Sequence, residues 1–177
     1  MNTNRFFIDS YIKRLTDQKI LGEKTFDQLN NEQIHFQPNK ESNSIAIIVQ
    51  HLHGNMVSRW TNFLTEDGEK PWRKRDEEFE LKFFNKEQII NLWNEGWHIF
   101  LQALSSLTDN DMTRTITIRN EELSVVDAIN RQIAHYSYHV GQIVFLGKWI
   151  KADEWKSLSI PVKGTAAFNE KMMGGKL

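Results

Sequence analysis

Residues 123–150 form the segment that most constrains the fold. The segment contains no proline, and its apolar side chains recur mostly at steps of three and four residues. They are Val125, Val126, Ile129, Ile133, Tyr136, Val140, Ile143 and Ile150. That spacing gathers them on one side of an α-helix, and a helix with one apolar side must pack against other elements. The sequence therefore predicts one long amphipathic helix inside a helical domain.

Three earlier segments show the same periodicity. It predicts helices at approximately 4–29, 44–64 and 86–107, in addition to the one over 123–150. One long connection, residues 65–85, joins the second helix to the third. Four long helices with one long crossover predict an all-α four-helix bundle, in which sites are built from side chains on facing helices.

The connections have patterns of their own. Residues 66–79 are dense in charges of both signs, which favours a solvated, ion-paired loop over the bundle surface. Residues 113–118 alternate and are rich in β-branched side chains, and the turn candidate 119–121 follows them, so a small hairpin is predicted between the third and fourth helices. After Pro161 we expect at most a short helix.

Composition excludes several classes of protein. A chain of 177 residues with 40% hydrophobic residues fits a single domain over 1–177 with a real core. The 22 basic and 23 acidic residues give no global field that would attract nucleic acid or an anionic membrane. The longest apolar run, residues 45–49, is too short to span a bilayer, so we expect a cytoplasmic protein. Cysteine is absent, so any thiol would have to arrive as a cosubstrate.

His135 and His139 are the most informative functional residues. Side chains four positions apart lie one above the other on a helix, so the two imidazoles could bind one metal ion together. The alternative is an accidental spacing, with one ring exposed and the other hydrogen-bonded in the core. Gln132 and Gln142 fall on the same flank of the helix and could orient the imidazoles.

A third ligand would have to come from another helix. His98 lies roughly opposite the apolar stripe of its helix and is expected at the surface, and nothing in the sequence indicates the direction of His35. His51 and His53 are about 200° apart around the helix axis, so only one of them can face the site.

The polar residues on one flank of the second helix favour His51 over His53 as the third ligand. Together with Asn55 and Arg59 it forms a ladder at steps of four residues, and polar groups so close to a core usually have partners. Asn55 and Arg59 could bind an anionic group of a substrate. Arg59 could equally form a structural ion pair with a buried carboxylate.

These residues carry a resemblance to a known family. The motifs are Ser44-Ile45 leading to His51-Leu52, and His135-x-x-x-His139-x-Gly141-Gln142-Ile143. In combination they resemble the DinB/YfiT-like superfamily of metal-dependent proteins. The stretches 54–56, 58–60 and 67–73 are similar to an uncharacterised branch from Bacillus-like bacteria. The resemblance implies up-down-down-up connections, frequent dimers, and a metal site made of His51, His135 and His139.

Three neutral histidines leave one coordination position open, as in catalytic zinc sites. Zinc or nickel suits such a shell, and iron is also compatible. The resemblance implies a thiol-dependent S-transferase, with a low-molecular-weight thiol as cosubstrate, or a hydrolase that acts on a small molecule. The alternative is a non-catalytic dimeric bundle with a structural metal, serving stress response or protein association.

Two predictions remain less defined. A general acid or base is not evident, and Glu41, Tyr136 and Tyr138 are the possibilities for that role. The three candidate catalytic residues are Asn55, Arg59 and Tyr136. Six tryptophans and eleven phenylalanines exceed what a small bundle needs, which predicts an isologous homodimer. Its interface would draw on Phe63, Trp72, Trp93 or Trp97.

Overall fold

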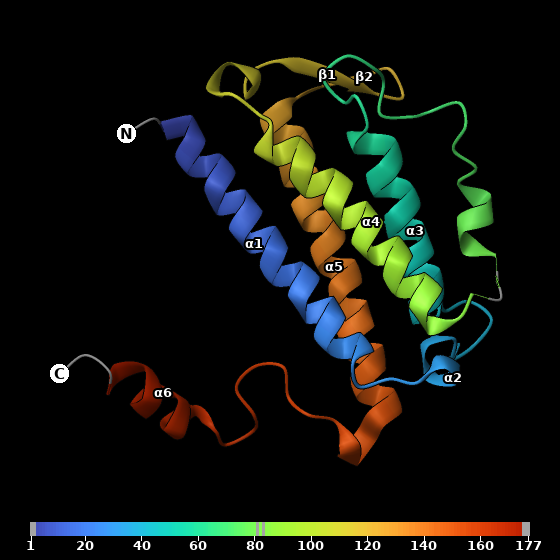
Figure 1. Cartoon of the computed structure of the whole chain (residues 1–177), viewed down its shortest axis with the longest axis vertical. Helices are drawn as coiled ribbons and strands as arrows, with labels where there is room; N and C mark the ends of the chain where they lie inside the picture. Colours follow the sequence, from blue (N-terminus) through green and yellow to red (C-terminus); the bar gives the residue numbers. More distant parts are fainter. Residues whose placement is uncertain (1–2, 81, 83, 175–177) are drawn as a thin grey trace.

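The computed structural model describes residues 3–80, 82 and 84–174, and within them it is mostly helical. The long helices α1 (Thr3–Phe26), α3 (Ile45–Trp60), α4 (Lys86–Ser105) and α5 (Val125–Lys151) lie side by side (Figure 1). The prediction of a helical bundle is confirmed. The shorter elements are α2 (Asn31–Ile34), η1 (Asp76–Phe79), η2 (Asp109–Asp111), β1 (Thr115–Ile118), β2 (Glu121–Ser124), η3 (Ala152–Glu154) and α6 (Thr165–Met173).

Side-chain caps define where the long helices begin. At the start of α3, the Ser44 side chain accepts a hydrogen bond from the backbone N–H of Ile47 at 3.2 Å. At the start of α5, the Ser124 side chain accepts one from the backbone N–H of Asp127. Asn85 and Gln88 form a reciprocal capping box at the start of α4. These caps satisfy backbone donors that would otherwise have no partner, so each helix has a sharp beginning.

Two predicted helix ends are wrong by several residues. The first helix ends at Phe26, and the residues expected to finish it lie in a turn before the short helix α2. The second ends at Trp60, because Thr61 is extended and Asn62 has a positive φ of 51°. The apolar spacing continues past both helix ends, although the backbone has already left helical geometry there. The sequence pattern therefore predicted helices that are too long.

The core between the helices is rich in aromatic rings. Trp97 and Phe100 of α4 pack against Tyr136 of α5, with ring centroids 5.8 and 5.1 Å from that of Tyr136. Gly22 makes room for Trp93, since an added Cβ at Gly22 would collide with the indole. The bundle core therefore uses much of the aromatic content that the sequence left unassigned.

This placement bears on the predicted dimer interface. Phe63, Trp93 and Trp97 are buried within the chain itself, whereas Trp72 is exposed. Only Trp72, of the four aromatic residues named for the interface, is thus available to a second copy without unpacking the core. The homodimer itself stays a prediction.

The predicted hairpin forms at one end of the bundle. β1 and β2 pair antiparallel with Thr115 opposite Ser124 and Ile118 opposite Glu121. Arg119 and Asn120 both have positive φ, the geometry of a two-residue primed turn that matches the twist of the strands. The hairpin lies across the ends of α3 and α5 (Figure 1).

The crossover between α3 and α4 departs from the expected solvated loop. The carboxylate of Asp67 accepts hydrogen bonds from the backbone N–H groups of Arg119 and Asn120, at 2.8 and 3.0 Å. Further along, Lys70 and Glu78 are buried. The prediction of ion pairing is confirmed, but that of full solvation is wrong, because the segment packs against the hairpin and α3.

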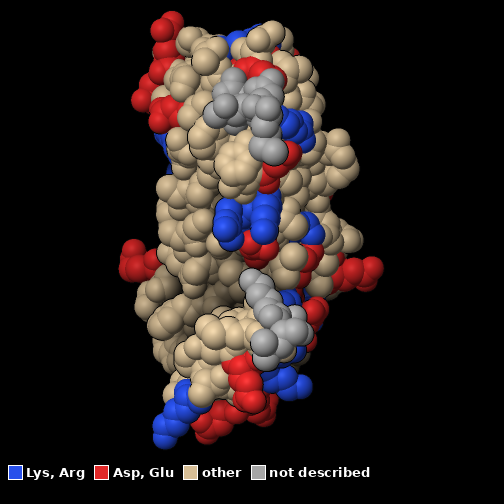
Figure 2. Space-filling view, turned by 90° about the vertical axis from the view of Figure 1, so that its left-hand side faces the viewer, with Lys and Arg blue, Asp and Glu red and all other residues tan. Residues whose placement is uncertain are grey.

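On the side that carries α1 and the C-terminal segment, the outer surface carries charges of both signs (Figure 2). Lys, Arg, Asp and Glu lie there in small scattered groups, and the surface is hollowed beside the C-terminal segment (Figure 2). Among the helices that the structure describes, none is both long and apolar enough to cross a membrane.

Candidate metal centre

Three histidines from two helices meet on the inner side of the bundle. His51 comes from α3, and His135 and His139 come from α5, one helical turn apart. One ring nitrogen of each lies within 4.8 Å of the others, and the Nε2 atoms of His51 and His135 are 3.3 Å apart. Such a cluster of nitrogen atoms could hold a metal ion.

The opposite nitrogen of each ring has an oxygen partner. The Nδ1 contacts are His51 with Glu78 (3.0 Å), His135 with Gln132 (3.4 Å) and His139 with Gln142 (2.7 Å). Carboxylate and amide oxygens accept hydrogen bonds, so each Nδ1 carries the proton and each Nε2 keeps a lone pair. Metal-binding histidines typically have this second contact, which orients the ring and increases its basicity.

Glu78 is the contact that sequence reasoning missed. Its carboxylate also accepts two hydrogen bonds from Arg73, at 2.7 and 3.0 Å. Gly54, three residues after His51, leaves space for it, since an added Cβ would collide with the carboxylate. Phe79 stacks on the His51 ring with centroids 4.9 Å apart. The signal in the sequence was Phe79, an apolar residue that directly follows the wholly charged run 73–78.

The electrostatics favour neutral imidazoles at His135 and His139 and a charged Glu78. Burial and the neighbouring His139 lower the pKa of His135 to about 3. Burial also lowers the pKa of His139 to about 4, against the opposing effect of its bond to Gln142. Burial raises the pKa of Glu78, but the hydrogen bonds from His51 and Arg73 outweigh it, and the net pKa lies below the usual value. Near pH 7, His135 and His139 therefore need lose no proton to bind a metal.

The other histidines lie outside this cluster. His53 is half-buried and contacts Glu95 through Nε2 at 3.0 Å. His98 is exposed, as the sequence predicted. The Nε2 of His35 is 2.6 Å from the backbone oxygen of Phe84, near the other end of the bundle. The structure thus brings His51, and not His53, to the pair on α5.

Tyr136 and Asn55, two of the three catalytic candidates, belong to a buried hydrogen-bond chain. Trp60 Nε1 donates to the Tyr136 hydroxyl at 3.2 Å, and that hydroxyl donates to Asn55 Oδ1 at 3.0 Å. Burial raises the pKa of Tyr136. Tyr138 instead is exposed and lies over the His139 ring with centroids 4.3 Å apart, while Glu41 is exposed and lines a cavity that also includes Gln142.

Arg59, the third candidate, lies near the end of α3 and is buried. Its Nη2 is 3.5 Å from Glu69, which supports the structural ion pair considered from the sequence. Its Nη1 is buried without a hydrogen-bond partner. Burial, and secondarily the charge of Arg73, lower the pKa of Arg59.

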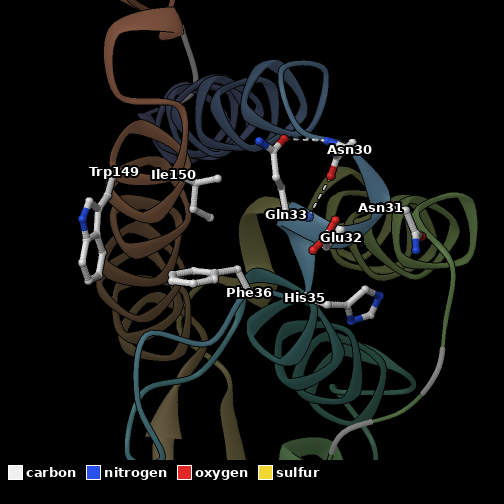
Figure 3. Close-up of a pocket in the computed structure, with 8 residues that line it drawn as sticks. All are labelled: Asn30, Asn31, Glu32, Gln33, His35, Phe36, Trp149 and Ile150. Carbon is white, nitrogen blue, oxygen red and sulfur yellow. Dashed lines mark hydrogen bonds between the residues drawn. The ribbon is translucent and has the colours of Figure 1, made fainter.

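Arg59 also borders a cavity of about 350 Å³ beside the histidines. The lining residues are Asn55, Arg59, Arg131, Gln132, Ala134, His135 and Tyr138. A larger cavity, about 960 Å³, lies between α2 and α5 and includes Phe36 and Trp149 (Figure 3). The three clustered histidines do not line the larger cavity, although His35 does.

The fold and the site together define a helical-bundle protein with a histidine cluster that could bind a metal. The chain belongs to the family described as "Protein of unknown function (DUF1572)", whose model matches residues 2–164. Among curated proteins, none matches the chain.

Proposed function

We propose that this protein is a metal-dependent enzyme acting on small molecules, with His51, His135 and His139 as the metal ligands. The observation that carries the proposal is the convergence of three imidazoles whose outer nitrogens all contact oxygen acceptors. Three neutral nitrogen ligands fit a divalent cation, zinc or nickel in the first place and iron as a further option. They also leave a coordination position open to a substrate.

A divalent cation in such a site would lower the pKa of a bound water or thiol towards neutrality. The reaction class would be transfer of a small electrophile onto a low-molecular-weight thiol, or hydrolysis of a small ester or amide. The chain has no cysteine, which is compatible with a thiol supplied from outside. The resemblance to the DinB/YfiT-like superfamily supports both the ligand set and an up-down-down-up order of the four long helices.

The remaining residues would organise the site. Glu78 would orient His51 through one hydrogen bond, and two hydrogen bonds from Arg73 hold the Glu78 carboxylate in place. Phe79 and Tyr138 cover the rings of His51 and His139 and restrict the access of water. Asn55 and Arg59 lie beside the cluster, where they would position a substrate.

The test is metal analysis of protein purified without a histidine tag, followed by activity screens. We expect about one divalent ion per chain, as in single-site zinc enzymes. The screens combine small electrophiles with glutathione, bacillithiol or mycothiol, and small esters without thiol. Turnover should require metal and should vanish in His139→Gln.

The matched control is His53→Gln, which alters a histidine of the same helix as His51 but outside the cluster. It should keep both metal and turnover. A protein that binds no divalent ion at micromolar concentration, or that loses metal equally in His53→Gln, would contradict the proposal.

A further inference from the structure

We propose that the cavity beside His135 binds an oxyanion group, a carboxylate or a phosphate, of the small-molecule substrate. Its role as a substrate site rests on the proposed function above. Its affinity for anions does not, and can be measured on the metal-free protein.

The charged residues that line this cavity are two arginines from different helices. Arg59 comes from α3 and Arg131 from α5, and His135 lies on the same wall. Among the described residues that line it, none is acidic. Guanidinium groups suit carboxylate and phosphate because their N–H groups match two oxygens at once. An oxyanion bound between them would place the rest of its molecule against the histidine cluster.

The neutral polar groups of the lining also present donors. The side-chain oxygen of Asn55 already accepts from Tyr136, and that of Gln132 lies 3.4 Å from His135 Nδ1. Both amides are therefore left with their NH₂ groups as the available hydrogen-bonding function. A lining composed of guanidinium and amide donors is complementary to a group that only accepts, which is the property of an oxyanion.

Arg59 has hydrogen-bonding capacity that the protein itself does not use. Its side chain is 8% exposed, and its Nη1 has no hydrogen-bond partner. Its one ion pair, with Glu69, is long at 3.5 Å, and Glu69 makes a closer contact with Arg119 at 2.9 Å. A buried guanidinium with an unpaired nitrogen is unfavourable unless a ligand completes it. The structural ion pair with Glu69 thus accounts for only part of the hydrogen-bonding capacity of Arg59.

The size of the cavity limits the ligand. A volume of about 350 Å³ lies at the lower end of the range for small-molecule sites. Tyr138 is exposed at the same wall, so an aromatic or short aliphatic body could pack against its ring. We therefore expect a compact organic acid or phosphate ester and not a polymer.

The experiment titrates metal-free protein at low salt with three probes: phenylacetate, phenyl phosphate and the neutral phenylacetamide. At least one of the anions should bind about tenfold or more tightly than the amide, as charge-assisted hydrogen bonds require. The tighter of the two anions identifies the group as carboxylate or phosphate. Equal binding of amide and anions, or no binding of either anion, would overturn the proposal.

Variants locate the binding. Arg131→Gln alters an exposed side chain and should weaken anion binding by about tenfold, and Arg59→Gln by more, because its guanidinium is buried. Arg131 forms an ion pair with Glu121 at 3.3 Å. Arg114→Gln is the matched control, since Arg114 has similar exposure and pairs with Asp111 at 3.0 Å, but lies outside the cavity. Should Arg59→Gln fail to fold, Arg131→Gln alone decides. A folded Arg131→Gln variant with unchanged affinity would contradict the assignment.

The two proposals fail separately. Metal titration of the same preparations reports on the histidines, and anion titration reports on the arginines. Anion binding without metal binding would keep this inference as an anion site and reject the metal-dependent enzyme. Metal binding without anion binding would reject the anion site and leave the proposed enzyme standing.

Discussion

The cavity between α2 and α5 and the smaller one beside His135 differ in how their polar groups are used. In the larger one, between α2 and α5, Asn30 and Gln33 bond to each other and His35 turns away from the aromatic pair to contact Phe84 (Figure 3). In the smaller one, the buried Nη1 atom of Arg59 has no hydrogen-bond partner. Unused hydrogen-bonding capacity, and not volume, therefore distinguishes the candidate site, because buried polar groups ordinarily have partners.

Of the changes that distinguish the two cavities, replacing His139 by alanine should have the largest effect on metal affinity. The variant loses one of three ligands, so metal affinity should fall by orders of magnitude, while a bundle held by its apolar faces stays folded. Trp149→Ala, which alters the larger cavity, should leave metal affinity unchanged. Competition titration with a metal-sensitive dye and circular dichroism measure the two effects.

The same variant separates a catalytic from a structural metal. At an open catalytic site, chelation should lower the free energy of unfolding only by the mass-action amount, about a few kcal/mol at saturating metal. The melting temperature should fall correspondingly, and the protein should stay folded at room temperature. Chelated protein or His139→Ala that is unfolded at room temperature would instead favour the non-catalytic bundle with a structural metal.

Glu78→Gln should have the next largest effect. It removes the charge that orients His51 but keeps the shape, so metal affinity should fall by about 10- to 100-fold. Glu95→Gln alters the equivalent contact of His53 and should have no effect on metal. Equal affinities in the two variants would show that the Glu78 contact does not tune the site.

Acid should destabilise the metal-free protein through the histidine cluster. The pKa is about 3 for His135 and about 4 for His139 in the folded chain, against about 6.5 when unfolded. Between pH 6.5 and 4 the unfolded chain binds protons that the folded chain does not, so the free energy of unfolding falls as pH falls. We expect a decrease of several degrees in melting temperature beyond that of a His135→Gln/His139→Gln variant.

His35→Gln is the control for the larger cavity and should follow the wild-type pH profile. Identical profiles for the wild type and the double variant would show that the cluster does not remain neutral in the folded protein.

The smallest effects concern association. Sedimentation at micromolar concentration should show the predicted homodimer, and Trp72→Ala should weaken it modestly if that exposed ring lies in the interface. Weakening by Trp149→Ala instead would assign the interface to the end that carries the larger cavity. A monomer in every case would reject the dimer.

The sequence by itself determined the helical periodicity, the hairpin, and the surface position of His98. It also pointed to His51, His135 and His139, because each could be placed on one flank of its own helix. Which side of a helix is buried follows from local spacing alone, so these inferences needed no knowledge of neighbours.

The tertiary structure alone decided the rest. Glu78 reaches His51 only because the crossover folds back onto α3, and Arg131 joins Arg59 only because α5 lies beside α3. Three of the four aromatic rings expected at an interface, those of Phe63, Trp93 and Trp97, fill the core instead. Contacts between residues distant in the chain depend on how the whole core packs, and no local pattern of spacing records them.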